Sequence, residues 1–244
     1  MADGNRPNAA NTAETGETGE TGETLNGPGS SVAAWVADPT PWGETVRYGP
    51  AVADETKLKL LGQLSGKRLL LLGCGRGQVV IETARRGAKV IGFEPDEALL
   101  AEARAHCRDA GLPAELYQRD LAELASIRAD TVDLVLSVLQ LAGVADLMRV
   151  FRQAHRVLRA EAPLVLSLPH PVRTQAAGGR FPLPWSGHGH HGIDHGHGIE
   201  SVFTALIRTG FRVDNLMELH DGADSLPAVL LLRARRTGAR PTTT

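Results

Sequence analysis

Short apolar runs alternate with amphipathic stretches along the middle of the chain, a pattern typical of an α/β domain. The apolar runs have the length and composition of strands that are covered on both faces. The stretches between them repeat apolar residues every three or four positions, as a helix with one buried face does. We therefore predict strands at Arg68–Leu72, Lys89–Phe93, Ala114–Gln118, Val132–Val138 and Leu164–Leu168, and helices at Gln78–Arg86, Asp96–Asp109, Ala145–Leu158 and Ile199–Thr209.

The end of the chain breaks this alternation. Two strand-like segments, Phe211–Leu219 and Ala228–Ala234, follow one another without a helix between them. Strands joined without a crossover helix pair antiparallel, whereas the earlier strands need helical crossovers and pair parallel. The predicted fold is α/β and Rossmann-like: a mostly parallel sheet of seven strands, closed by an antiparallel hairpin.

The two ends of the chain have a different composition. Residues 1–31 are rich in Gly, Thr and Glu, with a tandem Thr-Gly-Glu repeat, and too few apolar side chains to offset the entropy of ordering. We expect 1–31 to be a disordered tail and 237–244 to be frayed. The folded domain is then expected to span 42–235.

Composition narrows the function classes. The formal net charge is -2, so no overall positive field attracts nucleic acid. The longest apolar runs, Leu69–Leu72 and Val229–Leu232, are too short to span a membrane. The N-terminus is polar and the two cysteines, Cys74 and Cys107, have no framework spacing, which favours a cytoplasmic protein.

A glycine-rich loop, Gly73-Cys74-Gly75-Arg76-Gly77, stands directly between a predicted strand and a predicted helix. Glycine allows a sharp turn and a close approach of a ligand, and the first N–H groups of the helix face that ligand. A dinucleotide fingerprint requires a glycine three positions after Gly75, where Gln78 stands. The spacing therefore departs from that of a pyrophosphate-binding loop, and a tight turn without a ligand remains an alternative.

Acidic residues follow the next two predicted strands. Glu94 comes 21 positions after Gly73, and its carboxylate can accept hydrogen bonds from both hydroxyls of a ribose. Asp120 follows the third strand, where it can accept from an adenine amino group while Leu121 packs near the ring. A simple capping role for Asp120 is the alternative. Both acids lie at the edge where open α/β sheets bind their ligands.

These segments resemble the class I S-adenosylmethionine (SAM)-dependent methyltransferases over about residues 48–234. The resemblance rests on five motifs in order: Leu70–Gly77, Gly87–Asp96, Asp120-Leu121, Asp133–Val138, and Phe151–Arg159 with Pro163-Leu164-Val165. It implies SAM as the cofactor and methyl transfer to a small molecule by in-line displacement, with positioning supplying most of the acceleration. It implies a cofactor site formed by Gly73, Cys74, Gly75 and Gly77 at the methionine end, Glu94 and Pro95 at the ribose, Asp120 and Leu121 at the adenine, and Ser137 and Val138 at the mouth.

One position departs from the family pattern. Members usually carry Asp or Glu two residues before the first glycine, near the cationic methionine end, and here Leu71 stands there. Loss of such a charge-assisted bond costs roughly 1–3 kcal/mol unless another group replaces it. Two alternatives therefore stay open: a SAM-fold binding protein without catalysis, and an NAD-dependent oxidoreductase, which Gln78 disfavours.

The fifth strand ends in Pro169-His170-Pro171, at the same edge of the sheet. His170 is the candidate catalytic base, because a neutral imidazole can take a proton from an attacking hydroxyl or amine. The alternative is a loop histidine that serves turn geometry. In similar methyltransferases the approach to the first helix covers the cofactor, so Trp42 and Tyr48 are candidate substrate-covering residues, with core packing as the alternative.

A segment rich in histidine and glycine, 172–198, occupies the position of a variable substrate-covering insertion in this family. Phe181 and Trp185 are its candidate substrate-lining residues. Its histidines lack the fixed spacing of a preformed metal site, so we predict no functional metal. Neither the acceptor molecule and its reacting atom nor the oligomeric state follows from the sequence.

Overall fold

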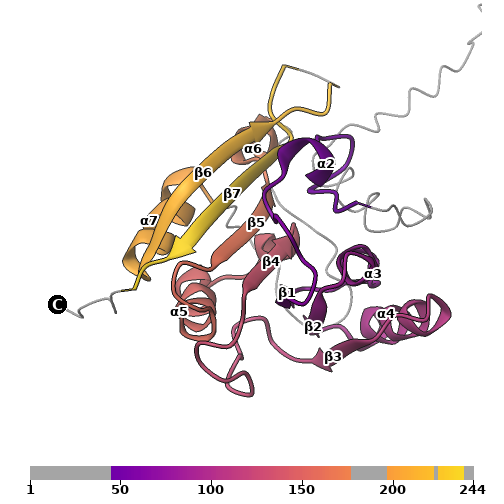
Figure 1. Cartoon of the computed structure of the whole chain (residues 1–244). Helices are drawn as coiled ribbons and strands as arrows, with labels where there is room; N and C mark the ends of the chain where they lie inside the picture. Colours follow the sequence, from indigo (N-terminus) through magenta and orange to yellow (C-terminus); the bar gives the residue numbers. More distant parts are fainter. Residues whose placement is uncertain (1–44, 177–196, 223–224, 239–244) are drawn as a thin grey trace, which may run out of the picture.

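The computed structural model describes residues 45–176, 197–222 and 225–238 of the chain. Its centre is a seven-stranded sheet with the strand order β3-β2-β1-β4-β5-β7-β6 (Figure 1). The strands are β1 (Arg68–Leu72), β2 (Lys89–Glu94), β3 (Ala114–Gln118), β4 (Leu134–Val138), β5 (Pro163–Pro169), β6 (Phe211–Leu219) and β7 (Val229–Arg236).

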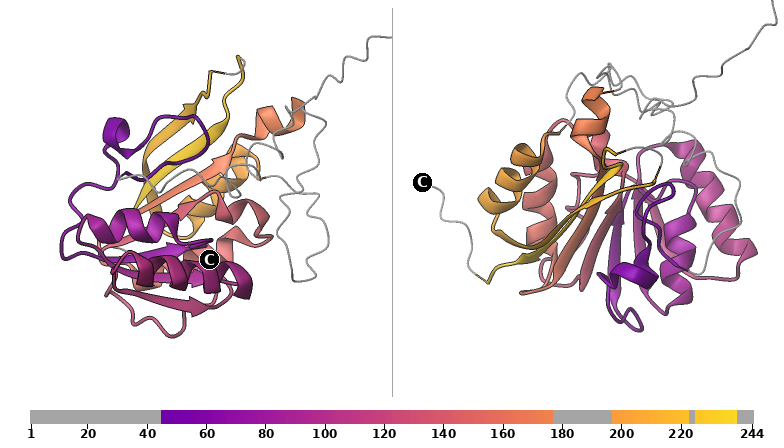
Figure 2. Two further views of the ribbon diagram at one scale, coloured as in Figure 1. Left: turned by 90° about the vertical axis from the view of Figure 1, so that its right-hand side faces the viewer. Right: turned by 90° about the horizontal axis from the view of Figure 1, so that it is seen from above.

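Helices cover both faces of this sheet. One face carries α3 and α4, and the other carries α5 and α7 (Figure 2). The described helices are α2 (Glu55–Leu58), α3 (Gln78–Arg85), α4 (Glu97–Asp109), α5 (Leu147–Val157), α6 (Pro171–Ala176) and α7 (Ile199–Arg208), with a 3₁₀ turn η1 (Gln140–Gly143).

The pairing confirms the predicted fold class. The first five strands all pair in parallel, in the order β3-β2-β1-β4-β5. β7 is antiparallel to both β5 and β6, so the last strand in sequence lies inside the sheet and β6 lies at its edge. A register shift between Val213 and Asn215 interrupts the β6–β7 ladder.

The core consists of two apolar layers that share the strands. Successive side chains of a strand point to opposite faces, so Leu70 and Leu72 pack with α5 and α7 while Leu69 and Leu71 pack with α3 and α4. All four leucines are fully buried. This double burial explains why β1 reads as a continuous apolar run rather than as an alternating one.

Side-chain caps fix where the crossover helices begin. Asp96 accepts hydrogen bonds from the backbone N–H groups of Ala98 and Leu99 at the start of α4. Asp146 accepts from Arg149 at the start of α5. Such caps satisfy N–H groups that have no partner within the helix. Because β2 and β4 both run parallel to β1, the two strands end at one common edge of the sheet.

Most predicted elements are confirmed, with small differences at their ends. β4 begins at Leu134 because Val132 forms only an isolated bridge with Leu158. The short elements α2, η1 and α6 were not predicted. Within 45–176, 197–222 and 225–238, no helix has the length and apolar character needed to cross a membrane.

Candidate functional site

The glycine loop is tied to the neighbouring strand. The N–H groups of Gly73 and Cys74 both donate to the carbonyl oxygen of Phe93, at 2.9 and 3.1 Å. Gly73, Gly75 and Gly77 have φ values of 80°, 50° and 93°, in the left-handed region that favours glycine. The loop therefore turns sharply from the end of β1 into α3, as its spacing predicts.

At two of these positions, close neighbours leave no room for a side chain. A Cβ on Gly73 would lie 2.3 Å from Gln140 Cβ, and a Cβ on Gly77 would lie 3.0 Å from Ala103 Cα. A Cβ on Gly75 would meet only Gln140 Nε2, at 3.8 Å. The space beside Gly75 and the Gln140 amide is thus the part of the loop where other atoms can approach the backbone.

Glu94 lies beneath this loop, at the end of β2. Its Oε2 accepts from the N–H of Gly75 at 2.7 Å, and its Oε1 accepts from the N–H of Asp96 at 3.1 Å. The side chain is fully buried, and desolvation raises the pKa of this carboxyl to about 7 despite the two hydrogen bonds. A carboxylate has room for about four donors, so Glu94 retains acceptor capacity for hydroxyl groups.

Gln140 is a site residue that the sequence analysis did not identify. It follows β4, and Leu139 before it has φ 62°, a left-handed turn that brings the Gln140 side chain onto the glycine loop. Gln140 Oε1 is buried without a hydrogen-bond partner. A buried acceptor without a donor costs roughly 1–3 kcal/mol, so this oxygen is suited to a ligand that brings a donor.

Leu71, in the position of the usual family acid, is fully buried in the apolar layer with α3 and α4. Gln140 offers an acceptor at the loop that Leu71 cannot offer. The only sequence signal for Gln140 is that a polar residue stands two positions after a buried strand, at the ligand-facing edge of the sheet.

A second buried carboxylate lies on α3. Gln78 Nε2 donates to Glu82 Oε1 at 3.2 Å, while Glu82 Oε2 is buried without a hydrogen-bond partner. Desolvation raises the pKa of Glu82 to about 7. Gln78, the residue that breaks the dinucleotide fingerprint, thus contacts a helix neighbour.

The predicted adenine residues lie after β3. Asp120 is exposed and its Oδ1 accepts from the N–H of Ala122 at 2.7 Å, which is the capping interaction considered as the alternative. The second Asp120 oxygen has no hydrogen bond within the part of the chain that the structure describes. Leu121 is buried and Pro95 is partly buried.

The residues predicted at the mouth are buried ones. Ser137 Oγ donates to the carbonyl oxygen of Leu72 at 2.9 Å, so it ties β4 to β1, and Val138 belongs to the apolar core. Cys74 is also buried, and desolvation raises the pKa of its thiol well above the ordinary value. These three side chains support the site from below.

His170 follows β5 at the same edge, as predicted. Its side chain is fully buried, Nε2 lies 3.0 Å from Glu218 Oε1, and Nδ1 accepts from the N–H of Val172 at 3.3 Å. Burial lowers the pKa of His170 despite the contact with Glu218, which favours the neutral ring with its proton on Nε2. The carboxylate of Glu218 is half-exposed, so it is the member of the pair that solvent reaches. The role of His170 as a base remains a prediction.

For Tyr48 the structure favours core packing over a substrate contact. The side chain is fully buried, and its hydroxyl donates to Glu55 Oε2 at 2.6 Å. Trp42, Phe181 and Trp185 lie outside the described residues, as does the histidine cluster from 188 to 195. Among described side chains no group of three or more His, Cys, Asp or Glu could hold a metal ion.

The chain is similar to known methyltransferases. Residues 69–161 match the family described as "Methyltransferase domain". A ubiquinone biosynthesis O-methyltransferase from Hahella chejuensis is 36% identical over 104 residues, which cover 43% of this chain and 44% of that protein. The matched segment therefore spans less than half of that relative.

Solved structures match over a longer stretch. An S-adenosylmethionine-dependent methyltransferase from Mesorhizobium loti has a TM-score of 0.62 and 27% identity, covering 73% of this chain and 95% of the other. The magnesium protoporphyrin IX methyltransferase from Synechocystis, with bound SAH, has a TM-score of 0.56 and 21% identity, covering 72% and 77%. The second likeness shows the fold alone.

Proposed function

We propose that this chain, which belongs to the class I SAM-dependent methyltransferases, transfers a methyl group from SAM to a hydroxyl of a small molecule. The observation that carries the proposal is the glycine loop closed onto Glu94 through the Gly75 N–H. The O-methyltransferase name of the relative supports the choice of a hydroxyl acceptor.

The described residues fit this cofactor in a specific way. Gly73, Gly75 and Gly77 form a backbone cradle that needs no side chain, and Glu94 supplies a desolvated acceptor for the ribose hydroxyls. We assign the unpartnered Gln140 Oε1 to the α-ammonium of the methionine end. Asp120 and Leu121 keep their proposed place at the adenine, with Pro95 beside the ribose.

Bound SAM supplies an electrophilic methyl carbon on a sulfonium, and the protein's task is to orient the acceptor and remove its proton. We propose that the His170–Glu218 pair removes the proton from the acceptor hydroxyl. The buried imidazole donates its Nε2 proton to Glu218 and holds that carboxylate in place. Glu218 is then the group that an acceptor hydroxyl meets, and His170 acts as a positioning residue.

Calorimetric titration of SAM into the full chain tests the cofactor. We expect micromolar binding by the unmodified protein and loss of most of that affinity in Glu94→Ala. Glu123→Ala, which removes an exposed carboxylate elsewhere, serves as the matched control and should bind as the unmodified protein does. No binding by the unmodified protein would contradict the proposal.

A second candidate function rests on Leu71. Because the family acid is replaced by a buried leucine, the domain is also compatible with a SAM-fold protein that binds without catalysis. Incubation with methyl-labelled SAM and a panel of small phenols and alcohols separates the two candidates. Labelled product supports the enzyme, whereas tight binding without transfer to any acceptor supports the binding protein.

A further inference from the structure

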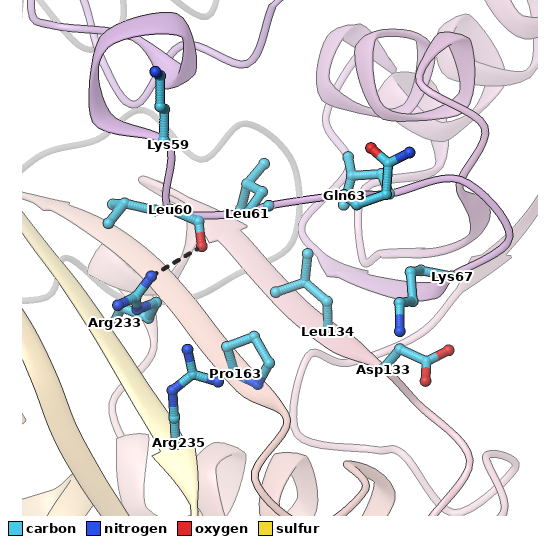
Figure 3. A pocket seen from close by; sticks show the side chains of 12 residues that line it. Lys59, Leu60, Leu61, Gln63, Lys67, Asp133, Leu134, Pro163, Arg233 and Arg235 are labelled. Atoms are coloured by element: carbon cyan, nitrogen blue, oxygen red, sulfur yellow. Dashed lines mark hydrogen bonds between the residues drawn. The ribbon is translucent and has the colours of Figure 1, made fainter.

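A cavity of about 250 Å³ lies at the edge of the sheet opposite the glycine loop (Figure 3). It opens where β4 and β5 begin, at Leu134 and Pro163, whereas the loop follows the end of β1. One wall is the connection 59–64 between α2 and β1, and the facing wall is the end of β7. The cavity is therefore separate from the proposed cofactor site.

Cationic side chains converge on this cavity from two sides. Arg233 and Arg235 lie along one side, and the ammonium of Lys67 lies on the other beside Asp133, while the Lys59 ammonium points away (Figure 3). The negative charge of Asp133 is offset by its ion pair with Arg159, whose Nη1 lies 2.7 Å from Oδ1, while Oδ2 accepts from the backbone N–H of Arg68.

One carboxylate holds both arginines in place. Arg233 Nε and Arg235 Nε donate to the two oxygens of Asp214, at 2.8 and 2.7 Å. Although burial raises it, the hydrogen bonds from both arginines lower the pKa of Asp214 below its ordinary value, so it stays charged. Two guanidinium groups thus share a single negative charge, and one positive charge is left over in addition to that of Lys67.

The wall formed by the connection 59–64 is also fixed before any ligand arrives. Glu55 accepts from the N–H groups of Leu60 and Leu61, at 2.9 Å each, and Arg233 Nη1 reaches the carbonyl oxygen of Leu60 at 3.5 Å. Arg235 Nη1 donates to the carbonyl oxygen of Glu161 at 3.1 Å. A ligand therefore meets oriented donors, which lowers the entropic cost of binding.

We propose that this cavity binds the phosphoryl group of a small dianionic ligand. Arginine donors in a fixed orientation suit the oxygens of phosphate, and the uncompensated positive charge suits a dianion. The cavity is small and polar compared with the apolar pockets that take large organic ligands. Its concave shape between the connection 59–64 and β7 favours a compact ligand over a nucleic-acid backbone.

The test uses calorimetry with pyrophosphate, inorganic phosphate and glycerol phosphate as separate probes, at constant ionic strength and without SAM. We expect saturable binding of at least one probe by the full chain. Lys67→Gln and Arg235→Gln should each weaken it about tenfold, the equivalent of one charge-assisted hydrogen bond. Binding of glycerol phosphate but not inorganic phosphate would identify an ester rather than the free anion as the ligand.

Arg152→Gln is the matched control, because it removes the same charge from the exposed side of α5 on the other face of the sheet. Lys67→Gln guards against misfolding, because the exposed Lys67 side chain makes no hydrogen bond or ion pair within the described part of the chain, and its backbone bonds to Leu64 and Lys89 persist in the variant. Equal weakening by Arg152→Gln would show non-specific attraction and overturn the proposal. Absence of binding by the unmodified chain, or equal affinity for succinate, would overturn it as well.

Discussion

The side chain of Gln140 lies against the backbone of Gly73, so closely that a Cβ on Gly73 would come within 2.3 Å of Gln140 Cβ and 2.4 Å of Cγ. This contact joins the loop after β1 to the turn after β4, two strands that are neighbours in the sheet. It places the unpartnered Gln140 Oε1 at the proposed cofactor site. Gly73 and Gln140 therefore act as one unit.

Gly73→Ala should destabilise the protein by about 3–4 kcal/mol, since it combines strain at φ 80° with overpacking against Gln140. Gly66→Ala is the matched control: Gly66 has φ 73°, but nothing lies within 4 Å of its missing Cβ. It should cost only about 1–2 kcal/mol, the strain alone. Urea unfolding of both variants measures the difference, and equal costs would contradict the role of the contact.

Gln140→Ala should weaken binding of S-adenosylhomocysteine about tenfold or more, because the ammonium of that ligand loses its proposed acceptor. Binding of 5′-methylthioadenosine, which has no ammonium, should not change. Gln140→Glu should strengthen binding of S-adenosylhomocysteine only. Calorimetry gives the affinity of the unmodified protein and of both variants for each of the two ligands.

The same titrations separate this role from the ribose anchor. Glu94→Ala should weaken binding of both ligands, since both carry the ribose. If Gln140→Ala weakened binding of the two ligands equally, the Gln140 side chain would only hold the glycine loop in its conformation. The assignment of its oxygen to the ammonium would then be wrong.

Glu82→Gln should make stability less dependent on pH. The pKa of this buried carboxyl is raised from 4.5 to about 7, so between these values the folded protein holds a proton that the unfolded chain has released. Stability from this group is therefore present at low pH and falls as pH rises through that window. At pH 8 the variant should gain up to roughly 3 kcal/mol over the unmodified protein, with little gain at pH 4.5.

Denaturant unfolding at the two pH values checks this. Glu94 has a similarly raised pKa, so part of the pH dependence should persist in Glu82→Gln. A gain of equal size at pH 4.5 and pH 8 would show that removal of the charge is not its cause.

Tyr48→Phe should lower the free energy of unfolding by about 1–2 kcal/mol, because the buried Glu55 carboxylate loses one of its donors. Tyr117→Phe offers a comparison: its hydroxyl also donates to a glutamate, Glu115, at 3.2 Å, but the pair is exposed. We expect a change below about 0.5 kcal/mol there. Thermal unfolding of both variants measures the contrast, and similar losses would contradict the argument from burial.

The sheet can be predicted from the sequence because strands that are buried on both faces consist of nearly continuous apolar runs. The bounds of β1, β3 and β6 agree with the predicted segments, since apolar runs and turn residues mark their ends. The short helices α2 and α6 escape prediction, because four or six residues are too few to show a helical period.

The site is harder to predict than the fold. The glycines and Glu94 are visible as motifs with fixed spacing. Gln140 belongs to no motif, and its position depends on the left-handed turn at Leu139, a conformation that leucine rarely adopts. The bond between His170 and Glu218 joins residues 48 positions apart, and only the sheet order brings them together.

The position of β7 between β5 and β6 has a consequence for how the protein is made. β6 is translated before β7, and β7 is its neighbour in the sheet. Until Val229–Arg236 has emerged, β5 presents an open row of backbone donors and acceptors, which is a template for aggregation. A chain that lacks Val229–Arg236 would therefore keep this edge of β5 unpaired, however completely its other strands have paired.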